Sequence, residues 1–344
     1  SDAPEPSFCD VQEDEAFDGT ALRRQYRIFF GEKKEESDVY VDVLAYLPKG
    51  AKGRSPILLN LSFMPNILNV SGDGIRPGRV WRPGSEAPVT VTEHGFFTMD
   101  ETIKKYLEAG FGFATLCYTD ITPDFDDGAS LGIRGLVKAE GPDSWGTISA
   151  WAWGVSKVID VLEKDKDIDA GRIALTGCSR LGKTALWTGA REQRIAAVLA
   201  SCSGEGGAAL YRRDFGENIR HMSDSTRYGY QFCPNYALNA KDVASMPVDA
   251  HMLVALIAPR PLLLQTGNSD VWSDPKGEWV SAVEGAPLYR LYGIDLGSDF
   301  VDPEALPAPE TPVWHRLSYV MHDGGHGVYP QDWDYYLEFL KRYL

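Results

Sequence analysis

Several features that would place this chain in a common class are missing from its 344 residues. No uninterrupted apolar run approaches the roughly 18 to 20 residues of a membrane helix, and the run at 252–258 has the length of a core segment. Positive charge is also scarce, since the formal net charge is −15, whereas nucleic-acid binding needs clustered Lys and Arg. We therefore expect a soluble protein that binds neither membrane nor nucleic acid.

Cysteine is scarce and shows no paired pattern. The five cysteines are odd in number and include no C-x-x-C motif, which argues against a disulfide framework and a zinc ribbon. Buried free thiols are the simpler interpretation, and a single disulfide is the alternative. The first residues, Ser-Asp-Ala-Pro-Glu-Pro, contain neither the basic nor the apolar part of an export signal, so such a signal has been removed or was never present.

Short apolar runs alternate with helical patterns along the chain. The runs are typical of parallel strands covered on both faces and lie at 56–61, 111–117, 172–176 and 261–265. Apolar residues recur at helical spacing at 102–109 and 145–163. This alternation predicts an α/β fold with crossovers and a parallel central sheet.

The remaining segments bear on domain organisation. The first forty residues are acidic and broken up, and the run at 39–47 then predicts an early strand near a sheet edge, as an antiparallel entrance. Stretches rich in Gly and Pro at 66–88 and 285–312 are interpreted as surface insertions rather than linkers, because sheet elements continue on both sides. We predict one catalytic domain over 1–344 rather than two.

A candidate nucleophile lies in a segment, 173–190, with the pattern of a strand, a tight turn and a helix. In α/β hydrolases such a turn raises the serine hydroxyl above the sheet and frees the next backbone N–H for an oxyanion hole. Ser179 occupies this turn, but Leu181 stands at the second glycine position of G-x-S-x-G and Gly182 follows one place late. An ordinary helix cap at Ser179 is therefore the alternative.

Chain order favours catalysis, because an α/β hydrolase presents its serine first, then the acid, then the histidine. His326 stands among glycines after a predicted last strand at 317–321 and before an amphipathic helix at 333–344. Such a loop can direct an imidazole into a cleft, so His326 is the preferred base and His322 its rival.

The acid is sought in the loop that follows the predicted strand at 261–265. Asp270 lies in that loop and is the first candidate, with Asp274 as the near alternative. A lone loop aspartate is more often a turn former, and only its place in the chain order favours Asp270. A serine needs such a base, acid and oxyanion donors because it is a weak nucleophile at neutral pH.

At this point the residues resemble a known family, the glucuronoyl esterases of carbohydrate esterase family 15. The resemblance extends from about residue 40 to the end and rests on four segments, at 177–183 (Gly-Cys-Ser-Arg-Leu-Gly-Lys), 203–207, 270–278 and 324–326. It implies an α/β-hydrolase fold, a three-layer sandwich with a mostly parallel sheet. It also implies hydrolysis of the ester between 4-O-methyl-glucuronate of glucuronoxylan and lignin alcohols. We expect a monomer that is secreted or periplasmic.

The resemblance assigns roles to individual residues. It implies Ser179 as nucleophile, His326 as base and Arg180 as an oxyanion-stabilising side chain, with no cofactor or metal. Contacts with the glucuronate are implied for Lys183, Glu217 and Trp272. The spacing agrees in part, because Lys183 lies one helical turn after Ser179 and can face the same cleft. A cation beside the nucleophile also stabilises a developing oxyanion.

The sequence departs from the fungal members at the acid. Those enzymes carry a glutamate just before a Ser-Gly-x-Gly-Gly segment, where this chain has Cys202. Some bacterial members use an aspartate after a later strand, which matches Asp270, and Glu205 is the runner-up. Fungal members also bridge the cysteine before the serine to one after the histidine, but Gly327 follows the histidine here. That disulfide is therefore absent, and the bacterial type is the better match.

Two other functions remain open. An acetyl xylan esterase, or another carbohydrate acyl esterase, would leave Lys183, Glu217 and Trp272 without a role. An inactive carbohydrate-binding protein on the same fold is the alternative from another class. The serine, the histidine and a suitable aspartate argue against that second alternative.

Overall fold

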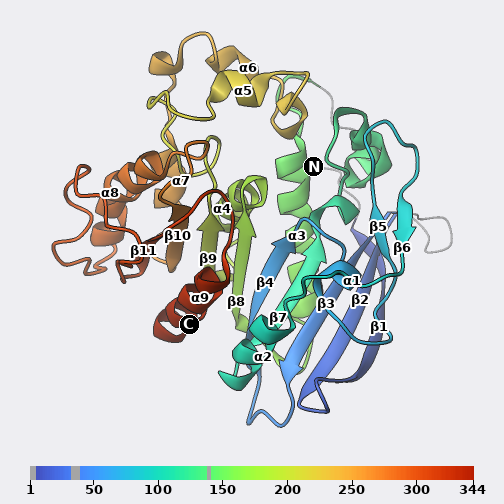
Figure 1. Cartoon of the computed structure of the whole chain (residues 1–344). Helices are drawn as coiled ribbons and strands as arrows, with labels where there is room; N and C mark the ends of the chain where they lie inside the picture. Colours follow the sequence, from blue (N-terminus) through green and yellow to red (C-terminus); the bar gives the residue numbers. More distant parts are fainter. Residues whose placement is uncertain (1–4, 32–38, 138–140) are drawn as a thin grey trace. The chain divides into compact units, whose positions relative to one another are not determined.

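The computed structural model describes residues 5–31, 39–137 and 141–344 (Figure 1). By their contacts the residues form two compact units, Ser1–Ile173 and Ala174–Leu344, called unit 1 and unit 2 below. That the whole chain is a single catalytic domain stays a prediction. Within the described ranges, no helix combines the length and the apolar character needed to cross a membrane.

Unit 1 contains a mixed run of strands in the order β1-β2-β3-β7-β4. Antiparallel pairs join β1 (Pro6–Ala16), β2 (Ala21–Phe30), β3 (Tyr40–Pro48) and β7 (Gly112–Cys117), and β7 pairs in parallel with β4 (Ser55–Ser62). A separate small sheet pairs β5 (Gly78–Val80) with β6 (Val89–Val91). The α-helices of unit 1 are α1 (Asn66–Asn69), α2 (Asp100–Glu108) and α3 (Thr147–Leu162).

The early strand expected at 39–47 is present as β3, and the antiparallel entrance is confirmed. The strand lies farther from the sheet edge than expected, because the preceding residues are not broken up. Two long strands precede β3 and make it an inner strand. These two strands are hard to recognise in the sequence because they contain many charged residues. Two of these residues, Arg23 and Arg24, are even buried in β2. Acidic partners make this burial possible, among them Asp14 and Glu13 on the adjacent strand β1. Residues 32–38 of this stretch lie outside the described residues.

Unit 2 contains strands in the order β8-β9-β10-β11, with β9, β10 and β11 paired in parallel. Their bounds are β8 (Ile168–Cys178), which begins in unit 1, β9 (Ile195–Ser201), β10 (Leu262–Gly267) and β11 (Leu317–His322). The accompanying α-helices are α4 (Arg180–Arg191), α5 (Ile219–Ser223), α6 (Tyr236–Asn239), α7 (Ala250–Ala255), α8 (Pro275–Leu291) and α9 (Pro330–Tyr343). Every residue of β10 and β11 is buried, as predicted for strands covered on both faces.

The predicted insertions are more regular than expected. Residues 66–88 include α1 and β5, and the predicted insertion at 285–312 starts too early, because α8 continues to Leu291. Gly285 belongs to the helix for a packing reason. A Cβ at this position would lie 3.0 Å from Val254 Cγ1 and 3.3 Å from the backbone oxygen of His251, so the glycine lets α8 approach α7 closely. Residues 292–312 then contain neither helix nor strand.

Candidate active site

Ser179 lies in a sharp turn between β8 and α4, and its backbone is strained. Its φ of 59° and ψ of −125° are unfavourable for a residue with a side chain. Its N–H donates to the Ser201 oxygen at 2.8 Å, which ties the turn to the end of β9. Its side chain makes no capping hydrogen bond, so the alternative of an ordinary helix cap is wrong.

The irregular glycine spacing around Ser179 has a physical cause. A Cβ on Gly177 would lie 2.4 Å from the backbone oxygen of Leu181, inside the turn itself. A Cβ on Gly182 would lie 2.6 Å from the backbone oxygen of Ser201. The late glycine therefore allows the first turn of α4 to approach the end of β9.

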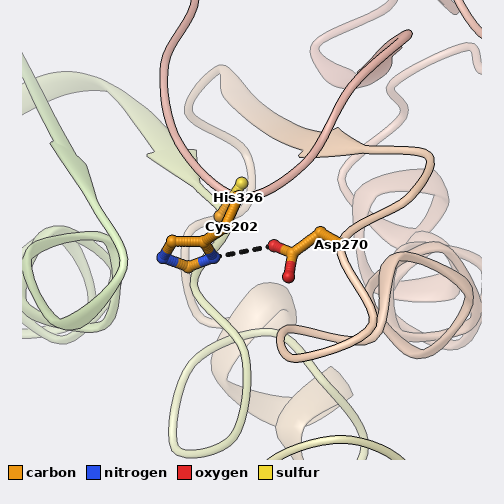
Figure 2. Close-up of side chains that lie close together, drawn as sticks. All are labelled: Cys202, Asp270 and His326. Atoms are coloured by element: carbon orange, nitrogen blue, oxygen red, sulfur yellow. Dashed lines mark hydrogen bonds and ion pairs between the residues drawn. The ribbon is translucent and has the colours of Figure 1, made fainter.

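His326 and Asp270 come together from the loops after β11 and β10 (Figure 2). His326 Nδ1 lies 2.8 Å from Asp270 Oδ2; the His326 side chain is 37% exposed and that of Asp270 is 1% exposed. The other carboxylate oxygen, Oδ1, accepts from the backbone N–H groups of Trp272 at 3.1 Å and Ser273 at 3.0 Å. These two backbone hydrogen bonds hold the Asp270 carboxylate in position independently of its contact with the imidazole.

The electrostatics of this pair favour the charged form of both groups. Burial would raise the pKa of Asp270, but the hydrogen bonds from His326 and Ser273 and the nearby imidazole hold it below its ordinary value. The hydrogen bond to Asp270 raises the pKa of His326, although burial acts against this. An imidazolium at His326 is therefore stabilised, as a general base requires after it has taken a proton.

Sequence reasoning missed Ser273, a third group on the imidazole. Its buried Oγ lies 3.0 Å from His326 Nδ1 and donates to the backbone oxygen of Cys202 at 3.2 Å. The available signal was local, because Ser273 is three residues after Asp270, where a backbone N–H meets the aspartate oxygen in a tight turn. Nothing in the sequence indicated that its hydroxyl would also contact the loops of β9 and β11.

Cys202 is the first residue after β9, and its side chain lies close to those of His326 and Asp270. Its φ is 41°, and its Sγ donates a long hydrogen bond of 3.6 Å to the Gly327 oxygen. The Cys178 thiol, next to Ser179 in the chain, is hydrogen-bonded with that of Cys202, which lowers the pKa of Cys178 to about 7. All five cysteines are free, as expected.

The rival residues have structural partners of their own. His322 is fully buried, with Nδ1 2.7 Å from Asp332 Oδ2 and Nε2 2.8 Å from the backbone oxygen of Gly325, so both ring nitrogens are engaged. Asp274 accepts from the Arg213 guanidinium at 2.8 Å and occupies the N-cap of α8. The geometry therefore favours His326 and Asp270 over both alternatives.

Lys183 and Glu217 form a buried ion pair. Lys183 Nζ donates to Glu217 Oε1 and to the backbone oxygen of Ser203, each at 2.7 Å. The same Glu217 oxygen accepts from the backbone N–H of Glu205 at 3.0 Å. Burial and the nearby Glu217 charge raise the pKa of Glu205 to about 9. Glu205 is thus neutral at physiological pH, which makes it a poor orienting acid.

The other predicted residues lie among aromatic and cationic side chains that the sequence did not indicate. The Arg180 guanidinium lies over the Tyr228 ring at 5.6 Å. Trp272 has the His221 ring at 5.5 Å and the Arg227 guanidinium at 6.0 Å. The backbone joins two of these loops, because the Glu217 N–H donates to the Trp272 oxygen at 2.8 Å.

Glu278 supports the loop after Cys202 from inside the core. It is fully buried, and its Oε1 accepts from Ser203 Oγ at 3.0 Å and from the Gly204 N–H at 2.7 Å. Burial raises the pKa of Glu278 to about 8, so the carboxyl is largely protonated at neutral pH. It thereby fixes the loop whose Ser203 oxygen accepts from Lys183.

Several known proteins are similar to this chain. A family profile described as "Glucuronyl esterase, fungi" matches residues 139–293. Carbohydrate esterase MZ0003, from an unknown prokaryotic organism, is 37% identical to this chain over an alignment 348 residues long, gaps included. The alignment covers 98% of this chain and 78% of that protein. Among solved structures, a glucuronoyl esterase from Solibacter usitatus matches with a TM-score of 0.88 at 37% identity, over 98% of this chain and 86% of that one.

A further solved structure, described as a promiscuous CE15 esterase from the marine bacterial metagenome, matches with a TM-score of 0.82 at 35% identity. The match covers 99% of this chain and 87% of that one. These similarities confirm the predicted α/β-hydrolase fold.

Proposed function

The chain belongs to the glucuronoyl esterases, carbohydrate esterase family 15, and from this premise we propose that it hydrolyses the ester between 4-O-methyl-glucuronate of glucuronoxylan and lignin alcohols. The observation that carries the proposal is the 2.8 Å contact between His326 Nδ1 and the buried Asp270 carboxylate. This contact lies in the same unit as the strained turn of Ser179. A serine esterase needs these three groups, and an α/β hydrolase presents them in this chain order.

In the first step, Ser179 Oγ attacks the carbonyl carbon of the uronate ester and His326 Nε2 takes its proton. Asp270 accepts the hydrogen bond from Nδ1–H, which keeps the lone pair at Nε2 and stabilises the imidazolium. Arg180 and the backbone N–H after Ser179 stabilise the oxyanion. The intermediate collapses when His326 gives the proton to the alcohol. Water repeats the sequence on the acyl-enzyme and releases glucuronate.

Lys183, Glu217 and Trp272 provide the sugar site in this proposal. Lys183 Nζ has three protons, and its contacts with the described residues use two of them, so the third is available to a substrate hydroxyl. Glu217 is an acceptor held in place by the same ion pair. Trp272 supplies an apolar ring face, against which a pyranose can pack.

The test is a comparison of esters and of a nucleophile variant. We expect the wild type to cleave benzyl glucuronate ester much faster than an acetyl ester, and Ser179→Ala to lose at least about 10⁴-fold in kcat. Labelling by a fluorophosphonate should occur in the wild type and be absent in Ser179→Ala. Faster turnover of acetyl esters would support the acyl esterase alternative instead, and an unlabelled wild type would support the inactive binding protein.

We also propose that the enzyme acts outside the cytoplasm, secreted or periplasmic, as a monomer. The proposed substrate supports this location, because a cross-linked polymer of xylan and lignin does not enter a cell. Light scattering coupled to size exclusion checks the oligomeric state, and a mass near 38.0 kDa is expected.

A further inference from the structure

Three different metal-ligating atoms meet at the ends of three strands. Cys202 Sγ, an Asp270 carboxylate oxygen and a His326 ring nitrogen all lie within 4.8 Å of one another (Figure 2). Thiolate sulfur, carboxylate oxygen and imidazole nitrogen are the ligand atoms that zinc prefers in proteins. Among the described residues, this is the one cluster of at least three such side chains.

The nitrogen and oxygen ligands need little movement to hold an ion. Nitrogen and oxygen ligands bound at about 2.0 Å in a tetrahedral site lie about 3.3 Å apart. His326 Nδ1 and Asp270 Oδ2 are 2.8 Å apart, so the ion needs the two groups to separate by only about half an ångström. The imidazole is the partly exposed member of the cluster and can make that movement.

We propose that Cys202, Asp270 and His326 form an inhibitory site for a divalent cation of the zinc class. The inference rests on the proposed esterase function, because the ion takes two of the groups that catalysis uses. The three side chains leave a fourth position of a tetrahedral site open to water. The site needs no new fold element, because the strand ends already hold each ligand.

Inhibition follows from the tautomer of His326. As a general base, the ring carries its proton on Nδ1 and keeps the lone pair on Nε2. An ion at Nδ1 takes that lone pair, so the neutral ring must carry its proton at Nε2 and cannot accept one from Ser179. The Nδ1 proton moves to Nε2, the thiol proton of Cys202 is released to water, and no electron is transferred.

A second histidine provides an internal comparison. His322 and Asp332 make an equally short contact of 2.7 Å, but no cysteine completes a cluster with them. The thiol of Cys202 therefore distinguishes the two His–Asp pairs. Removal of this thiol should weaken ion binding by at least about ten-fold while the His326–Asp270 contact remains.

The experiment titrates Co²⁺ and Zn²⁺ into the metal-free full-length protein and into Cys202→Ala and Cys233→Ala. We expect the wild type and Cys233→Ala to bind one ion with a cobalt–thiolate charge-transfer band. Esterase activity should fall in step with occupancy and return on addition of a chelator. Cys202→Ala should keep its metal-free activity, lose the band and need at least about ten-fold more Zn²⁺ for half inhibition. Cys202→Ser, which keeps the size of the side chain, serves if the alanine variant does not fold.

Ion binding and esterase function are read out separately, because the absorption band needs no substrate. A wild type without the band, or a Cys202→Ala variant that Zn²⁺ inhibits at the same concentration, would overturn the proposed site. A bound ion that leaves glucuronate ester hydrolysis unchanged would overturn its inhibitory role. If the band appears but metal-free protein cleaves no glucuronate ester, the proposed function fails and the ion site stands.

Discussion

Units 1 and 2 both bury charged side chains, but they compensate them in different ways. In unit 1, the nearly buried Arg24 meets three acids, Glu13, Asp165 and Asp167, and Arg23 meets Asp14. In unit 2, three buried carboxyl oxygens have no partner among the described residues, one each on Glu205, Glu278 and Asp332. All the buried carboxyl oxygens left in this state lie in unit 2.

This difference indicates that the buried charges of unit 1 have a structural role, whereas those of unit 2 belong to a functional site. Ion pairs that satisfy each other, as in unit 1, lock strands together and leave no group ready to react. Buried carboxyls that lack a partner on one oxygen and have a raised pKa, such as Glu205 and Glu278, are typical of functional sites. At such sites a protein buries polar groups at a cost in stability, because they position the reacting residues. Substitutions at the site in unit 2 should therefore change activity, with or without an effect on stability, and those in the ion pairs of unit 1 should change stability alone.

The largest expected effect separates the two candidate acids of unit 2. Asp270→Ala should lower kcat/KM on a glucuronate benzyl ester by about 10³- to 10⁴-fold, because the imidazole loses its orienting carboxylate. Glu205→Ala should lower it far less, because the neutral Glu205 does not hold the imidazole. Steady-state kinetics on both variants make the measurement. Near-normal activity in the first with collapse in the second would reverse the assignment.

The next effect should appear in unit 1 and concern stability alone. Arg24→Met leaves the buried Asp165 without its cation and should lower the free energy of unfolding by about 3–5 kcal/mol. The kcat/KM of the folded enzyme should remain unchanged. Denaturant unfolding and kinetics on the same sample test both parts. Lys104→Met, which removes the exposed pair with Glu101, is the control and should leave the unfolding curve unaltered. Loss of activity in folded Arg24→Met would refute the division of roles.

A smaller effect is expected for Ser273, which we regard as a positioning residue. Ser273→Ala should lower kcat by about ten-fold with little change in KM, because one hydrogen bond to a group that becomes charged is lost. Ser281→Ala is a matched control, since Ser281 is a buried serine of unit 2 whose hydroxyl has no partner among the described residues. Equal kinetic effects in both variants would show that the Ser273 contact has no special role.

The last prediction concerns the pH dependence of stability, where the effect per pH unit is small. The folded-state pKa of Glu278, about 8, lies above the ordinary value of 4.5, so between these values the folded protein holds a proton that the unfolded chain releases. Rising pH therefore favours unfolding, by at most about 1.4 kcal/mol per pH unit for one group. Glu278→Gln should flatten this slope in unfolding curves from pH 5 to 8. The exposed Glu284→Gln, on the same helix, should keep it.

The contact between His326 and Asp270 could be anticipated from the sequence because both residues repeat a local pattern. Ser179, Asp270 and His326 each follow a short apolar run, and the carboxyl ends of parallel strands meet at one edge of a sheet. The strands β1 and β2 could not be predicted from alternation, because β1 is rich in acidic residues and buried arginines interrupt the pattern of β2. Ser273 and Glu278 were missed for another reason. Their roles come from contacts with loops 53 to 75 residues away in the chain.

The contact between the loops of Glu217 and Trp272 limits how this enzyme can be modified. A Cβ on Gly216 would lie 2.3 Å from the backbone oxygen of Trp272, and the next N–H, that of Glu217, donates to the same oxygen. The segment of Glu217, which we propose to contact the sugar, is therefore packed against the segment that carries Asp270, the proposed acid. An engineering experiment that aims to change the substrate preference, by loop grafting or by a mutant library, must vary both segments together. Neither segment can be exchanged alone, because the backbone of one packs against the backbone of the other.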